Sequence, residues 1–227
     1  MRNPAHAAKP PRPQRQQMTA LDAAQTAALL KSLKADRLYI PVALAISTGM
    51  RRGEVLALKW AEVELECGQL MIARSLEQTK KGLGFKTPKT AKSRRRIALP
   101  KVAVRLLRAH KIAQARAKLR LGPAHQDHGL VCARPDGAPR PPSNFSTAFA
   151  AHIRRHKLPH VRFHDLRHTH ATQLLKQGVH PKIVSERLGD SNIAITLDTY
   201  SHVLPGMQEE AIAALDASLT AVIEGEE

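Results

Sequence analysis

The stretch RFHDLRHTHATQLL, from Arg162 to Leu175, begins a predicted helix whose first turn carries His164, Arg167 and His168. His164 and His168 lie four positions apart, the spacing at which a helix offers two imidazoles to one metal ion. His164 and Arg167 lie three positions apart, the spacing at which a base and a guanidinium reach one phosphate group. The stretch therefore poses a choice between a metal ligand and a phosphate ligand.

The metal interpretation is the weaker one. HDLRH resembles the H-E-x-x-H helix of metalloproteases, but Asp165 replaces the longer general-base Glu and Arg167 places a cation beside the metal position. No third ligand stands at a regular spacing downstream, although His170 and His180 are loose candidates. We therefore expect no metal site, and rank a zinc hydrolase last. A purely structural alternative, in which the two histidines of the motif are polar core residues, stays open.

The charge of the chain favours a polyanionic partner. The 227 residues hold 36 Lys and Arg against 19 Asp and Glu, a net charge of +17. Residues 208–227 hold six of the acids and no Lys or Arg, so residues 1–207 carry +23, from 36 basic and 13 acidic side chains. Such a field attracts nucleic acid, although a generic basic protein is the alternative. The 3% aromatic content disfavours a single-strand binder that stacks bases on aromatic rings.

Cysteine content and hydropathy indicate the compartment. Cys67 and Cys132 lie far apart and outside any metal-binding spacing, which is typical of a protein from a reducing cytosol. No apolar run approaches the roughly 18 residues of a membrane span. The basic, proline-rich residues 1–18 lack the apolar core of a secretory signal, and we expect an extended linker there. We expect a cytoplasmic, nucleoid-associated protein with no membrane contact.

Hydrophobic periodicity predicts a mainly helical domain with one small sheet. Residues 18–33 form a predicted helix with Thr19 as its N-cap, residues 37–47 a buried helix, and residues 51–60 a short amphipathic helix. Residues 68–78 and 94–100 are rich in alternating or β-branched side chains, which predicts two or three antiparallel strands. Further helices are predicted at about 101–120, 142–157, 164–177, 181–189, 193–200 and 206–222.

Three other segments complete the requirements of phosphoryl transfer, which needs cations on the phosphate oxygens, a nucleophile and an acid for the leaving oxygen. TGMRRGEVLALKW places Arg51 at the start of a helix, and guanidinium forks bind phosphate oxygens bidentately. KTPKTAKSRRR, from Lys86 to Arg96, supplies lysines on a hairpin-like segment. TLDTYSHV places Tyr200 ahead of a C-terminal helix. Each segment alone is weak evidence, but together they favour a phosphate over a metal ion as the ligand of the helix that begins at His164.

In this order, these motifs resemble the tyrosine recombinases of the phage integrase type, over roughly residues 19–207. The resemblance implies a tyrosine recombinase catalytic domain, in the α+β class, that acts on duplex DNA. It implies that Arg51, His164 and Arg167 surround the scissile phosphate and that Tyr200 attacks it to leave a 3′-phosphotyrosyl link, with no metal or cofactor. A phenol of pKa about 10 is a poor nucleophile at neutral pH, so two guanidiniums must favour the phenolate, and His164 is expected to accept the proton.

The lysine-rich hairpin supplies the general acid that the resemblance implies. Lys89 best matches the family's mobile lysine, which protonates the departing 5′ oxygen, and Lys86 and Lys92 are the alternatives. We expect Lys86, Lys92, Arg94 and Arg95 to contact DNA.

One residue departs from the family pattern. The family has His or Trp where RLGD has Asp190, and a carboxylate near a phosphate repels it. We expect Asp190 to pair with Arg167 or Arg51, in competition with DNA. The alternative function is therefore a catalytically impaired integrase remnant that acts as a DNA-binding module.

The family also implies an arrangement of domains and protomers. We expect a basic tail over residues 1–18, the catalytic domain over residues 19–207, and an acidic helix over residues 208–227 that is exchanged between protomers. In the last of these, Ile212, Leu215, Leu219, Val222 and Ile223 form an apolar stripe. The expected assembly is a monomer in solution and a homo-tetramer on two DNA sites. Integrases usually carry an N-terminal DNA-clamping domain, and we expect only the short tail in its place here, either in an excised catalytic domain or in a natural remnant.

Overall fold

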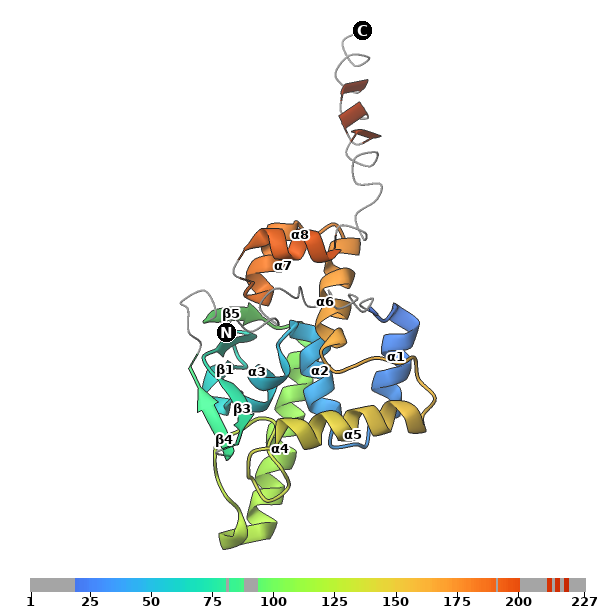
Figure 1. Ribbon diagram of the computed structural model, residues 1–227. Helices are drawn as coiled ribbons and strands as arrows, with labels where there is room; N and C mark the ends of the chain where they lie inside the picture. The colour runs from blue at the N-terminus through green and yellow to red at the C-terminus, as the bar shows by residue number, and fades with distance from the viewer. Residues whose placement is uncertain are drawn as a thin grey trace, which may run out of the picture.

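Helix α2 (Tyr39–Thr48) forms the centre of the fold because its sequence is apolar on nearly every side. The computed structural model describes residues 19–80, 82–87, 94–190 and 192–200 and six residues between 212 and 220. Around α2 pack α3 (Arg52–Ala57), α4 (Lys101–Leu121) and α6 (Asp165–Lys176), as Figure 1 shows. Each fully buried Leu or Val side chain contributes about 1.5–3 kcal/mol to folding, so this central helix anchors the elements that carry the site.

The strands form two separate antiparallel sheets. The first has the order β1 (Val63–Glu64), β2 (Gln69–Ile72), β5 (Arg95–Ala98), and the second pairs β3 (Ser75–Thr79) with β4 (Gly82–Lys86). Leu70 of β2 lies opposite Ile97 of β5, and both are buried in the main core. The predicted small antiparallel sheet is therefore confirmed, but the strand expected over residues 68–78 divides between two sheets.

The remaining helices confirm most of the predicted segments. They are α1 (Ala23–Ser32), η2 (Trp60–Glu62), η4 (Gly122–Ala124), α5 (Pro142–Arg155), α7 (Pro181–Leu188) and α8 (Ile193–Tyr200). The predicted N-cap Thr19 is wrong. Asp22 caps α1, because its carboxylate accepts from the backbone N–H of Gln25 at 2.7 Å and the Gln25 side chain accepts from the Asp22 N–H at 3.1 Å.

The ends of the chain are described least. Residues 1–18, expected as a tail, lie outside the described residues. Of the helix expected over residues 206–222, the six described residues are helical. Ile212, Leu215 and Leu219 expose 57%, 53% and 48% of their surface, whereas Val222 and Ile223 lie outside the described residues.

A second, smaller core holds α7 and α8 against α6, at the upper end of the body in Figure 1. Its buried members are Ala171, Leu175, Val184, Leu188 and Tyr200. Because the ring of Tyr200 is part of this core, the packing of α6, α7 and α8 fixes the position of the phenol.

The turn at Gly49 brings the end of α2 against the second core. Gly49 ends α2 with a φ of 69°, a left-handed conformation that glycine adopts without strain. A Cβ at this position meets Leu188 at 2.6 Å and His170 at 2.7 Å. The glycine therefore allows α2, α6 and α7 to approach closely just before Arg51.

We predict that Gly49→Ala destabilises the protein more than Gly178→Ala does. Gly178 also has a positive φ, 77°, but a Cβ there meets nothing within 4 Å. The left-handed conformation costs an alanine about 1–2 kcal/mol at either position, and overpacking adds about 1–3 kcal/mol at Gly49 alone. Denaturant unfolding of both variants measures the difference, and equal free energies of unfolding would contradict the close packing at Gly49.

Candidate active site

Arg51 lies in the turn between α2 and α3 and is held by Glu54, one turn further along. The backbone N–H of Arg51 donates to Glu54 Oε2 at 2.8 Å, and its guanidinium donates to Glu54 Oε1 at 3.2 Å. Burial alone would raise the pKa of Glu54, but hydrogen bonds and charge from Arg95, with help from Arg51, lower the pKa below its usual value. Glu54 is therefore a carboxylate that fixes Arg51, whose side chain remains 41% exposed.

Arg167 is buried on the first turns of α6, with 5% of its surface exposed. Its Nη1 donates to the backbone oxygens of Gly49 at 2.9 Å and Leu188 at 2.8 Å, and its Nη2 donates to Asp190 Oδ1 at 2.6 Å. Burial, and then the positive charge of Arg51, lower the pKa of Arg167 to about 10, while Asp190 acts in the opposite direction. At neutral pH the guanidinium therefore keeps its charge.

Asp190 joins the two arginines. Its Oδ1 accepts from Arg167 and also from Arg51 Nη2 at 3.3 Å, while its Oδ2 accepts from Thr196 Oγ1 at 3.1 Å. The expected pairing of Asp190 with Arg51 or Arg167 is confirmed, and with both of them rather than one. A single carboxylate oxygen thus marks a position that two guanidiniums converge on, which is what a phosphate oxygen requires.

The two histidines of the motif, His164 and His168, lie in different surroundings. His164 is exposed at the edge of the site, and partial burial and the charge of Arg167 lower the pKa of its ring. His168, one turn further along, packs its ring edge-on against His164, with centroids 5.2 Å apart. His164 is therefore exposed, whereas His168 is half-buried.

Tyr200 ends α8 with 4% of its surface exposed. Burial raises the pKa of its phenol above the usual value. Its hydroxyl lies 2.6 Å from Nδ1 of His168. The sequence prediction named His164 as the acceptor of the phenolic proton, but the structure places His168 at the hydroxyl. The two residues are 32 positions apart, so no local motif signals this contact.

The basic hairpin is described only in part. Lys86 is exposed and pairs with Glu77 at 3.1 Å, and Arg94 is exposed. Lys89 and Lys92 lie outside the described residues.

The prediction that Arg95 contacts DNA is wrong. Arg95 exposes 8% of its surface, and its guanidinium pairs with Glu54 at 3.0 Å and donates through Nε to the backbone oxygen of Arg187 at 2.8 Å. The alternation along β5 explains this, because Arg95 shares the inward face with Ile97. Arg95 positions Glu54 and, through it, Arg51.

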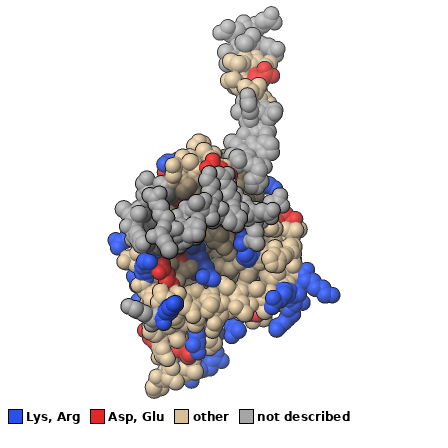
Figure 2. All heavy atoms as spheres, viewed as in Figure 1, with Lys and Arg blue, Asp and Glu red and all other residues tan. Residues whose placement is uncertain are grey.

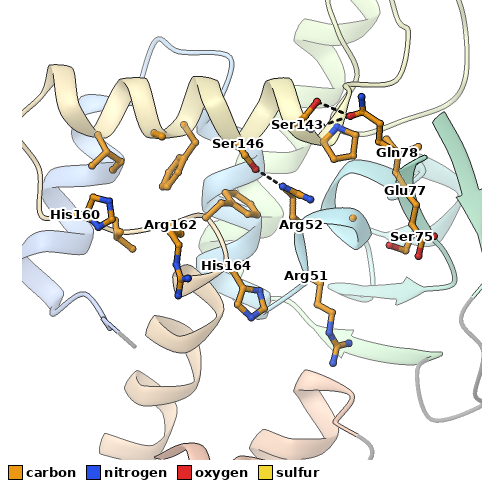
Figure 3. Close-up of a pocket in the computed structure, with 18 of the residues that line it drawn as sticks. Arg51, Arg52, Ser75, Glu77, Gln78, Ser143, Ser146, His160, Arg162 and His164 are labelled. Atoms are coloured by element: carbon orange, nitrogen blue, oxygen red, sulfur yellow. Dashed lines mark hydrogen bonds between the residues drawn. The ribbon is translucent and has the colours of Figure 1, made fainter. Parts of the chain in front are cut away.

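A cleft of about 1130 Å³ opens beside Arg51. Figure 3 shows α5 along one side of it, with the Ser143 hydroxyl bonded to Gln78 and the guanidinium of Arg52 bonded to Ser146. Arg51 and His164 extend from the opposite side. Around the body, Lys and Arg side chains outnumber Asp and Glu on the face that Figure 2 shows. The cleft therefore has a basic lining, from Arg52 and Arg162 among others, that leads to Arg51.

His170 and His180, the other candidate metal ligands, have hydrogen-bond partners within the protein. His170 lies between the backbone oxygen of Ile46, 2.8 Å from its Nδ1, and Arg187 Nε, 2.9 Å from its Nε2, and His180 Nδ1 accepts from the N–H of Lys182. Among the described residues, no group of three or more His, Cys, Asp or Glu is arranged to hold a metal ion. In the same residues, no helix is long and apolar enough to cross a membrane.

Curated relatives of the chain are integrases and recombinases. It is 34% identical over 198 residues to a tyrosine recombinase XerC-like protein of Caldanaerobacter subterraneus subsp. tengcongensis, covering 82% of this chain and 51% of the relative. It is 31% identical over 173 residues to the ICEBs1 integrase of Bacillus subtilis, covering 76% of this chain and 47% of the relative. The chain thus spans about half the length of these relatives.

Solved structures share the fold. The Tn1549 transposon integrase in complex with circular intermediate DNA matches with a TM-score of 0.75 at 20% identity, over 88% of this chain and 68% of that one. The catalytic domain of bacteriophage HP1 integrase matches with a TM-score of 0.55 at 17% identity, over 86% of this chain and 94% of that one. The model of the phage integrase family matches residues 15–207, which include both arginines, His164 and Tyr200. The chain belongs to the phage integrase family of tyrosine recombinases.

Proposed function

We propose that this chain is the catalytic domain of a site-specific DNA recombinase that cleaves and rejoins duplex DNA in the integration or excision of a phage or mobile element. The observation that carries the proposal is the convergence of Arg51 and Arg167 on one anionic oxygen, that of Asp190, beside the second core that holds Tyr200. The DNA complexes formed by the Tn1549 integrase support DNA as the substrate of this chain. The comparisons favour this function over that of a DNA-binding remnant.

The scissile phosphate replaces the carboxylate of Asp190 between the two guanidiniums. Arg51 and Arg167 then neutralise its non-bridging oxygens and the charge that develops in the transition state. Tyr200 attacks phosphorus, the bond to the 5′ oxygen breaks, and a 3′-phosphotyrosyl link forms. The link retains the bond energy, so a second 5′-hydroxyl rejoins the strand without ATP, metal or cofactor. Lys89 is the proposed proton donor to the 5′ oxygen, with Lys86 or Lys92 as alternatives.

The duplex lies along the cleft beside α5. Arg52 and His164 border this cleft next to Arg51, and Lys86, Lys92 and Arg94 are the proposed further contacts with the duplex. Residues 1–18 follow the phosphate backbone, and residues 19–207 form the catalytic unit. The DNA substrate implies that the protein works at the nucleoid.

The assembly on DNA is a tetramer of chains that are monomers in solution. The apolar stripe of the tail supports the exchange of residues 208–227 between protomers, because its described members Ile212, Leu215 and Leu219 are about half exposed, at 57%, 53% and 48%. Burial of such a stripe against a neighbouring protomer stabilises the assembly.

We predict that Tyr200→Phe abolishes covalent capture of a nicked suicide DNA substrate and leaves DNA affinity near the wild-type value. The substitution removes only the nucleophilic oxygen and keeps the ring in the second core. A denaturing gel detects the protein–DNA adduct, and a filter-binding titration gives the affinity. EDTA is expected to change neither result. An adduct formed by the Phe variant would refute the nucleophile, and a loss with EDTA that zinc reverses would support a metal site.

We predict that Asp190→His raises the single-turnover rate of adduct formation by roughly tenfold to a thousandfold, the scale of one charge-stabilising donor. The substitution removes the carboxylate that competes for Arg51 and Arg167 and supplies an N–H to the phosphate. Asp190→Asn is the matched control, because it removes the charge at nearly the same size. It should raise DNA affinity and increase the rate less than His does. Equal rates in all three proteins would place Asp190 outside the reacting groups.

We predict that deletion of residues 208–227 reduces synapsis of two DNA sites and spares binding to one site. The removed segment carries the stripe and six acids but no basic residue, so phosphate contacts stay intact. Native gels with one-site and paired-site DNA separate the two effects. Tetramer formation by the shortened chain at the wild-type level would show that the tail has no role between protomers.

A further inference from the structure

The contact between His168 and Tyr200 gives the nucleophile a proton acceptor inside the protein. The phenol oxygen lies 2.6 Å from Nδ1 of His168, and their ring centroids are 5.7 Å apart. When Nδ1 carries no hydrogen, the hydroxyl of Tyr200 is the donor and Nδ1 the acceptor. This requires the tautomer of His168 that carries its hydrogen on Nε2. In that tautomer the hydrogen bond has the direction in which a proton leaves Tyr200.

The surroundings of His168 keep its imidazole neutral. His164 packs against its ring, Asp165 and Arg167 lie on the same helix, Arg162 precedes that helix, and Tyr200 faces it from α8. Burial of the ring is the main cause that lowers the pKa of His168 to about 4, and His164 and Arg167 act in the same direction. Above that pH the lone pair of Nδ1 is available.

We propose that His168 is a catalytic residue that takes the phenolic proton of Tyr200 during strand cleavage and returns it during religation. This assignment rests on the recombinase function proposed above. His168 touches the reacting oxygen itself, whereas no hydrogen bond joins His164 to Tyr200 among the described residues. The two histidines lie one turn apart on one face, so His164 serves the phosphate at the open edge and His168 serves the nucleophile at α8.

The step balances without any further reactant. The O–H bond of Tyr200 breaks and its proton moves to Nδ1, which makes His168 an imidazolium. The phenolic oxygen bonds to phosphorus, the bond from phosphorus to the 5′ oxygen breaks, and that oxygen takes a proton from the general acid. Religation runs in reverse, and the imidazolium gives its proton back to the departing phenolic oxygen.

The substrate itself makes the transfer more favourable. A phosphodiester beside the pair favours the charged imidazolium and so raises the pKa of His168. Arg167 lowers the pKa of Tyr200, and Asp190 raises it. A phosphate that takes the place of Asp190 brings a similar negative charge, so the raised pKa of His168, and not a lowered pKa of Tyr200, is what favours the transfer.

The test measures single-turnover cleavage of the suicide substrate by wild type, His168→Gln and His168→Ala. A glutamine oxygen accepts a hydrogen bond from the phenol but cannot take its proton. Both variants should therefore lose about 10²–10⁴-fold in rate, the usual contribution of a general base. The loss should also shrink about tenfold for each unit of rising pH, because hydroxide replaces the missing base. His128→Gln, an exposed histidine away from the site, is the matched control and should cleave at the wild-type rate.

Three results overturn the assignment. A glutamine variant with the wild-type rate would reduce His168 to a positioning residue, and a pH-independent loss would show that no proton transfer is affected. Failure of the wild-type protein to form an adduct would overturn the recombinase function, and the role of His168 with it. DNA affinity and thermal unfolding of each variant, measured alongside, separate a chemical loss from misfolding.

Discussion

The buried guanidinium of Arg167 is the interaction on which the rest of the site depends. It donates to the backbone oxygens of Gly49 at the end of α2 and Leu188 at the end of α7, and to the carboxylate of Asp190. Carbonyls at helix C-termini lack partners within the helix and favour a cation. A buried charge is tolerated because these acceptors use its donors. Arg167, which binds the phosphate in the proposed reaction, thus also joins α6 to the ends of α2 and α7.

Two acids hold the arginines, and their surroundings give them different roles. Glu54 accepts from the N–H and guanidinium of Arg51 and from both terminal nitrogens of Arg95. Asp190 shares one oxygen between Arg51 and Arg167. Loss of Glu54 would leave the buried Arg95 uncompensated, which is costly. Asp190 can be exchanged for another anion without that loss, so in the proposed reaction the phosphate displaces Asp190 and leaves Glu54 in place.

The sequence predicted the elements that depend on local pattern and missed those that depend on distant partners. Helices such as α4 and α8 follow from apolar spacing and lie where expected. Arg95 was assigned to DNA because it stands in a basic run, although its alternation with Ile97 already indicated an inward side chain. Its acid partner lies 41 positions away, and the phenol's partner His168 lies 32 positions away. Such pairings arise from the packing of helices, which periodicity does not specify.

Asp190 and His168 together link ionisation of the nucleophile to the arrival of substrate. Burial is the main cause that raises the pKa of the Tyr200 phenol, and the charge of Asp190 adds to it while Asp190 lies between the arginines. A phosphate in the same place brings a similar charge, but it also supplies the electrophile that consumes the phenolate as it forms. The proton then moves across a hydrogen bond that is already made. In the proposed reaction, an acid at this position therefore competes with the phosphate for the arginines, while burial keeps the nucleophile protonated until a phosphate is bound.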